Sequence, residues 1–162
     1  MPNSVLFLSD IKHSSLIGLL QRYQLELIIV ADENIPGSFW GDAEAGLIEN
    51  RVYARLDTPI HSILHESCHY VCMDANRRSS LHTNAEGDYD EENAVCYLQI
   101  LLSDEIQEMG QQRMFQDMDN WGYSFRLGSA SRWFELDATD ARLWLTQHQL
   151  TTDNRPSFQL RQ

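Results

Sequence analysis

The stretch HESCH, residues 65–69, carries two histidines four residues apart and a glutamate directly after the first histidine. On a helix, residues four apart lie one turn apart on the same face, so both imidazoles can bind a single Zn²⁺ ion. Glu66 would then lie beside the metal without binding it, where a general base for a water molecule at the metal is needed. The stretch therefore predicts a zinc site in which His65 and His69 are ligands and Glu66 is the catalytic residue.

The residues around this stretch favour a buried helix. Thr58 is a suitable N-cap and Pro59 suits a first helical position, which predicts a helix over 59–74. Between residues 59 and 73 the only carboxylate is that of Glu66, and no lysine or arginine occurs. Because a buried carboxylate without a partner is costly, Glu66 requires a cation or a proton nearby.

A catalytic zinc ion usually takes three protein ligands and leaves one position for water. Ala75 lies six residues after His69, which excludes the HExxHxxGxxH arrangement. A second helix, predicted over 91–108, begins with Glu91 and Glu92. Glu91 shares its helical face with the apolar residues, whereas the face of Glu92 is more polar: Ala94, Val95, Leu98 and Leu102 against Cys96, Gln99 and Ser103. We expect the ligand to point where the core residues point, so Glu91 is the predicted third ligand and Glu92 the alternative.

This pattern resembles the gluzincin metallopeptidases, and most closely the small ImmA/IrrE-like group. The matching residues are His65, Glu66 and His69, followed by Glu91 with Ala94 and then the apolar run 97–102. The resemblance implies that the two histidines and the later glutamate bind zinc, while Glu66 activates water for hydrolysis of a peptide bond. It also implies a small mixed sheet whose edge strand, within residues 50–56, precedes the active-site helix. We hypothesise that this strand holds an extended peptide by edge pairing.

Four further residues are candidates for the site. His61, one turn before His65, and Tyr53 are possible second-shell or oxyanion-stabilising groups, and His82 could enter the cleft from the loop over 75–90. Cys72 lies on the ligand face, so a His/His/Cys site or a closed structural site remains open. The alternative for Cys72 is a small buried apolar side chain, as free cysteines usually are.

The elements that must position these residues indicate an α+β fold. Hydrophobic periodicity predicts strands and then helices; in chain order these are a short apolar run at 5–10, a helix at 14–23, strands at 24–33 and 45–56, the helix at 59–74, and helices at 91–108 and 139–149. Residues 111–137 have no clear period, and the last twelve residues read as a tail. We expect a single domain, 1–162, with a minimal zincin-like architecture: a small mixed β-sheet packed on the HExxH helix, with further C-terminal helices.

The composition restricts the partners. Twelve basic residues against twenty-four acidic ones give a formal net charge of -12, which disfavours nucleic acid and anionic membrane surfaces. No apolar run approaches the roughly 20 residues of a membrane span, and we find no signal peptide. Three cysteines are too few for a disulfide framework, so a cytoplasmic location is expected.

Two functions are consistent with these features. The first is a zinc-dependent hydrolase, specifically a metallopeptidase that acts on a peptide or protein substrate. The alternative is a non-catalytic, zinc-stabilised domain for protein interaction, in which Cys72 or another group closes the fourth position of the metal.

Overall fold

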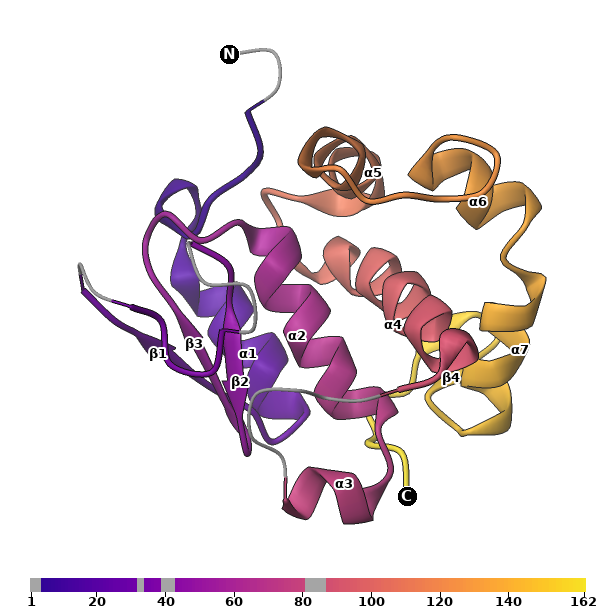
Figure 1. The fold of residues 1–162 in the computed structure, drawn as a ribbon, viewed down its shortest axis with the longest axis horizontal. Helices are drawn as coiled ribbons and strands as arrows, with labels where there is room; N and C mark the ends of the chain where they lie inside the picture. Colours follow the sequence, from indigo (N-terminus) through magenta and orange to yellow (C-terminus); the bar gives the residue numbers. More distant parts are fainter. Residues whose placement is uncertain (1–3, 32–33, 39–42, 81–86) are drawn as a thin grey trace.

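The computed structural model describes residues 4–31, 34–38, 43–80 and 87–162 (Figure 1). Within these ranges the chain forms seven α-helices, two short 3₁₀-helices, a three-stranded sheet and a two-stranded sheet. The elements are η1 (Leu8–Asp10), α1 (His13–Arg22), β1 (Glu26–Ile29), β2 (Gly46–Ile48), β3 (Arg51–Ala54), α2 (Ile60–Cys72), α3 (Ala75–Ser79), α4 (Tyr89–Leu102), η2 (Ser103–Glu105), α5 (Gly110–Trp121), α6 (Ala130–Leu136), α7 (Thr139–Gln147), β4 (Thr151–Thr152) and β5 (Arg155–Pro156). The mixed helix and strand content expected from the sequence is confirmed.

The three-stranded sheet is small and mixed, with the strand order β1-β3-β2. β1 runs parallel to β3, and β2 runs antiparallel to it, with Leu27 and Leu47 both aligned with Val52. The strand predicted over 45–56, where Gly46 or Asn50 could mark a bend or turn, is in fact β2 and β3, because the chain turns at Glu49, whose φ is 54°. The expectation that residues 50–56 offer a sheet edge is therefore wrong: β3 is the central strand, and β1 and β2 occupy both of its sides.

The outer side of β2 is also partly engaged. The Leu47 amide donates to the carbonyl of Gly37 at 3.3 Å, and the Ala45 amide donates to Ser62 Oγ at 2.9 Å. These hydrogen bonds use backbone groups that an added strand would need at this edge.

Helix α2 lies between the sheet and α4 (Figure 1). Ile60, Ile63, Leu64 and Val71 of α2 are fully buried, which fixes the helix in the core. The helix begins one residue later than predicted, after Pro59, because the Thr58 hydroxyl accepts from the Arg55 amide instead of capping the helix.

The predicted apolar run at 5–10 is not a regular strand. Phe7 forms an isolated bridge with Pro59, and the Ile60 amide donates to the Leu6 carbonyl at 2.8 Å. Residues 8–10 then form η1. This segment supplies an acceptor for one of the N–H groups that the first turn of α2 leaves unpaired.

Helix α4 is surrounded by protein, with α2, α5 and α7 packed around it (Figure 1). Every residue from Ala94 to Leu102 is buried. A helix buried on all sides has no single inward face. The apolar pattern of α4 therefore does not show which of its faces meets α2.

The C-terminal third completes the core. Residues 111–137, which showed no clear period, form α5 and α6, and a short β4–β5 hairpin follows α7. The segment predicted as a tail runs back to α2, where the Arg161 amide donates to the Val71 carbonyl at 3.0 Å. None of the helices in the described part of the chain combines the length and the hydropathy of a membrane span.

Candidate metal centre

Two histidines of α2 direct their Nε2 atoms at one carboxylate of α4. His65 Nε2 lies 3.1 Å from Glu92 Oε1, and His69 Nε2 lies 3.2 Å from Glu92 Oε2. The two imidazole rings stand nearly perpendicular, with their centroids 4.8 Å apart. Two imidazole nitrogens therefore face the two oxygens of one carboxylate, and two imidazoles with one carboxylate are the donor types of a His₂Glu zinc site.

The carboxylate at this point belongs to Glu92 and not to Glu91, so the predicted position of the third ligand is corrected. Glu91 points to the C-terminal end of α2. There its carboxylate pairs with Arg77 at 2.5 Å and with Arg161 at 3.0 Å. The prediction assumed that the most apolar face of this helix would meet the HExxH helix. Since α4 is buried on all sides, its apolar face meets other elements, and its more polar face meets α2.

That polar face contained a signal that the sequence reasoning missed. Glu92, Cys96 and Gln99 follow one another at positions i, i+4 and i+7, in a helix that is otherwise apolar beyond its first turn. All three are groups that bind a metal or orient its ligands, and all three lie close to His65.

Gln99 determines which nitrogen of His65 has a lone pair available to bind a metal. Gln99 Nε2 donates to the His61 carbonyl at 3.0 Å, so Gln99 Oε1 is the atom that faces His65 Nδ1, at 2.9 Å. His65 must therefore carry a proton on Nδ1, which leaves the lone pair of the neutral ring on Nε2. This is the nitrogen that faces Glu92.

Tyr123 and His61 lie beside Gln99 and contact each other. The Tyr123 hydroxyl lies 3.1 Å from His61 Nδ1 and 3.4 Å from Gln99 Nε2, and its ring contacts that of His65 edge-on. Burial lowers the pKa of His61 to about 3 and raises that of Tyr123 to about 12, so both are neutral near pH 7. His61 is thus placed as a neighbour of the supporting amide, and Tyr123 is a participant that sequence reasoning did not identify.

Glu66 is half-buried beside the two histidines. One of its carboxylate oxygens lies within 4.8 Å of a ligand nitrogen of both His65 and His69. Burial raises the pKa of Glu66 to about 7, the charge of His65 opposes this, and Glu92 and Glu44 add to it. A carboxyl group with a pKa near neutrality can both accept and return a proton.

The pKa values of the two histidines and of Glu92 are shifted in different directions. Burial acts to lower the pKa of His65, but Tyr123, Cys96 and Glu92 together raise it well above the usual value. Burial and the charge of His65 lower the pKa of His69 to about 4. The pKa of Glu92 is lowered, because the hydrogen bond from His65 and the charges of the two histidines outweigh burial.

Comparisons with protein-family models, with curated proteins and with solved structures find no match to this chain. Its function is therefore argued from the residues of the chain itself.

The remaining sequence candidates have different positions. Cys96, not Cys72, belongs to a metal-capable group in the described residues, since its Sγ lies within 4.8 Å of ligand atoms of His65 and Glu92. Cys72 is fully buried, with a free thiol whose pKa burial raises. Tyr53 is half-buried on β3 and forms no hydrogen bond or ring contact with these site residues, and His82 lies outside the described residues.

The donor set fits a zinc ion better than a hard cation. Two neutral imidazoles and one carboxylate suit zinc, whereas magnesium and calcium prefer oxygen ligands throughout. The hydrogen bond from His65 Nδ1 to Gln99 is the outer contact that such a ligand histidine usually makes.

Proposed function

We propose that this protein is a zinc-dependent hydrolase, specifically a metallopeptidase acting on a peptide or protein substrate. His65, His69 and Glu92 would hold the metal, and Glu66 would be the catalytic acid–base. The observation that carries the proposal is the approach of both Nε2 atoms to the Glu92 carboxylate, with a Glu66 carboxylate oxygen within 4.8 Å of a ligand nitrogen of each histidine.

Each residue has a separate chemical part in this proposal. Bound zinc would supply Lewis acidity toward water and toward the carbonyl of the scissile bond. Glu66 would remove a proton from the attacking water and later deliver it to the leaving amine. Gln99 would keep the Nε2 lone pair of His65 directed at the metal position.

Substitution of Glu66 by Gln tests the catalytic part. The Gln side chain has nearly the same shape but cannot accept the proton, so we expect one zinc per chain to be retained and hydrolysis to be lost. Zinc would be measured by plasma mass spectrometry, and hydrolysis by mass spectrometry of a proteome-derived peptide library. Glu135→Gln, on an exposed position of α6, is the control that should change neither. Hydrolysis by Glu66→Gln at the wild-type rate would contradict the proposal.

Paired substitutions of Glu91 and Glu92 test the ligand assignment. Glu92→Ala removes a ligand, whereas Glu91→Ala removes only a neighbour of the site, so Glu92→Ala should weaken zinc binding by the larger factor. Both affinities would be measured by competition with a chromophoric chelator. If Glu91→Ala lost more zinc affinity than Glu92→Ala, Glu91 and not Glu92 would be the third ligand.

A second candidate function is a non-catalytic, zinc-stabilised domain for protein interaction. The observation that favours it is Cys96, whose sulfur lies beside His65 and Glu92 and could complete a closed metal site. Replacement of zinc by Co²⁺ distinguishes the two candidate functions. A thiolate ligand such as Cys96 would give Co²⁺ an intense charge-transfer band in the near ultraviolet. The metallopeptidase proposal expects no such band, and expects Cys96→Ser to leave the cobalt spectrum unchanged.

A further inference from the structure

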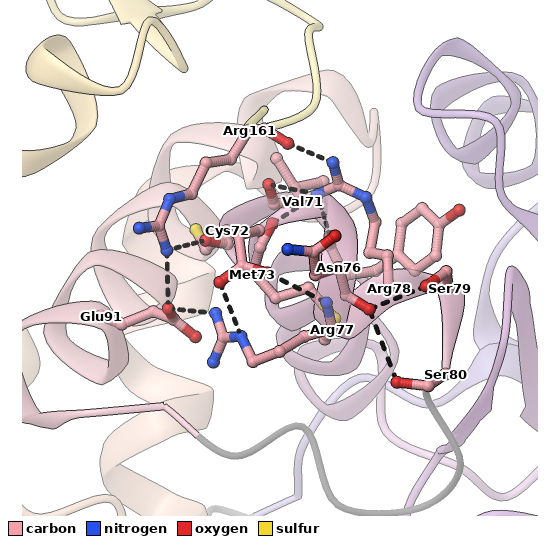
Figure 2. A network of polar contacts seen from close by, with 12 residues as sticks. Val71, Cys72, Met73, Asn76, Arg77, Arg78, Ser79, Ser80, Glu91 and Arg161 are labelled. Carbon is pink, nitrogen blue, oxygen red and sulfur yellow. Dashed lines mark hydrogen bonds and ion pairs between the residues drawn. The ribbon is translucent and has the colours of Figure 1, made fainter.

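A cluster of arginines joins the C-terminal end of α2 to the first turn of α4 (Figure 2). Glu91 Oε1 accepts from Arg77 Nη2 at 2.5 Å and from Arg161 Nη1 at 3.0 Å. The Glu91 side chain is only 5% exposed, and Arg161 is 22% exposed. Because a buried carboxylate is costly without opposite charge, the two guanidinium groups are needed to hold Glu91 where it lies.

Arg161 also caps α2. The same Nη1 that contacts Glu91 donates to the Cys72 carbonyl at 3.1 Å, and the Arg161 amide donates to the Val71 carbonyl at 3.0 Å. Arg78 donates to the carbonyls of Tyr70 and Met73 and to that of Arg161 itself (Figure 2). The last carbonyls of a helix lack partners within it, so these contacts fasten the C-terminal segment to the helix that carries the histidines.

The first turn of α4 takes part in these contacts through Glu91. The Glu91 amide is capped by Asp88 Oδ1 at 2.8 Å, and a Cβ atom at Gly87 would come within 2.6 Å of Glu91 Oε2. The Glu92 side chain, in contrast, is 49% exposed, so packing alone does not fix it. Consecutive helical residues point about 100° apart, which lets Glu91 be held at the end of α2 while Glu92 faces the histidines.

We propose that Arg161 is a positioning residue of the metal centre: by joining Glu91 to the end of α2, it holds Glu92 opposite His65 and His69. This inference rests on the proposed metal site. The ring of Trp144, 5.0 Å from the Arg161 guanidinium carbon, supports the side chain from α7. A residue of the C-terminal segment thereby contributes to metal binding without touching the metal.

Zinc affinity of the folded chain tests this role. Arg161→Ala should weaken zinc binding by about 10–100-fold, the usual effect of losing an outer-shell contact. Arg155→Ala is the matched control, since Arg155 is an exposed arginine of the same C-terminal segment and should leave the affinity unchanged. The affinity would be measured by competition with a chromophoric chelator, after circular dichroism has verified the fold of each variant.

A double substitution shows whether Arg161 acts through Glu91. If it does, Glu91→Gln and Arg161→Ala should weaken zinc binding by similar factors, and the two together by hardly more than either alone. Arg161→Lys, which keeps the charge and the donors, should recover part of the affinity. A residue that only capped α2 would lower the stability of the metal-free protein and leave the affinity of the folded form unchanged.

The outcomes separate this inference from the proposed function. If the wild-type chain binds no zinc, both are overturned. If the wild type binds zinc and folded Arg161→Ala binds it equally well, only the positioning role is overturned. If the factor by which the double variant loses zinc affinity equals the product of the two single-variant factors, Arg161 does not act through Glu91.

Discussion

Gln99 accepts from His65 and donates to the carbonyl of His61, so its amide has one favoured orientation. We expect Gln99→Leu to weaken zinc binding by about 10–100-fold, because His65 loses the group that fixes its tautomer and ring position. Zinc competition with a chromophoric chelator measures the change.

Ser103→Ala is the control for that substitution. Ser103 is buried on the same face of the helical segment, but its hydroxyl donates only to the nearby Ile100 carbonyl. Its loss should leave zinc affinity unchanged. Equal affinities of Gln99→Leu and the wild type would show that the Gln99 amide has no influence on the metal.

The pH dependence of zinc binding follows from the charge state of the ligands. The pKa of His65 is raised well above its ordinary value, and that of His69 is lowered to about 4. Near pH 7 His65 is therefore the protonated histidine of the metal-free site, and zinc must displace its proton. The affinity should increase about tenfold per pH unit up to the pKa of His65 and level off above it.

Isothermal titration calorimetry in buffers of different ionisation enthalpy checks this directly. The expected result is net release of protons at pH 7, because zinc displaces the proton of His65 and its charge favours the ionised form of the neighbouring Glu66. Zinc binding without proton release would contradict the assigned charge state of His65.

The sequence predicted the part of the site that depends on local geometry. His65, Glu66 and His69 lie on one helix, so their relative positions follow from a spacing of four residues. The choice between Glu91 and Glu92 depends on which side of α4 meets α2, and that is a property of the packing around the whole helix. Tyr123 comes from a distant segment, and its sequence neighbours carry no motif that points to His65.

At the scale of elements, the C-terminal end of α2 is closed by arginine side chains. Arg78 donates to the Tyr70 and Met73 carbonyls, so Arg78→Ala leaves part of this end unpaired. We expect the free energy of unfolding of the metal-free protein to fall by about 1–3 kcal/mol. Urea denaturation followed by circular dichroism measures it.

Arg142→Ala is the matched control for Arg78→Ala. Arg142 is exposed on α7, and a surface substitution of this kind should change the free energy of unfolding by no more than about 0.5 kcal/mol. A comparable loss in both variants would indicate a general effect of removing positive charge from an acidic protein.

Other elements were predicted less well for identifiable reasons. The β-forming residues of 45–56 predicted one strand, because only Glu49 and Asn50 separate the apolar pair Leu47–Ile48 from the alternating run at 51–56. The run at 5–10 is apolar because it lies against the start of α2, and not because it belongs to the sheet. Helix α3, at Ala75–Ser79, was predicted as loop, since a single short turn capped by Asp74 leaves no periodic pattern.

At the scale of the whole molecule, zinc should raise stability, because the ligands come from two different helices. Binding to the folded form alone stabilises by about 2.7 kcal/mol at a free zinc concentration 100 times the Kd. We expect the midpoint of urea denaturation to rise with zinc and to return on addition of a chelator. Mg²⁺, which prefers oxygen ligands, should have no such effect.

His69→Ala is the control for this dependence. Without one of the ligands, the midpoint should no longer respond to zinc over the same concentration range. A response that persists in His69→Ala would place the stabilising metal elsewhere in the molecule.

The contact between Arg161 and the Cys72 carbonyl joins residues 89 positions apart, and that between Arg161 and Glu91 joins residues 70 apart. Closing loops of this length is slow compared with forming a helix. During synthesis from the N-terminus, His65, His69 and Glu92 leave the ribosome well before Arg161 does. Under the proposed role of Arg161, the growing chain carries His65, His69 and Glu92 before the residue that steadies them, so we expect tight zinc binding only after Arg161 has emerged.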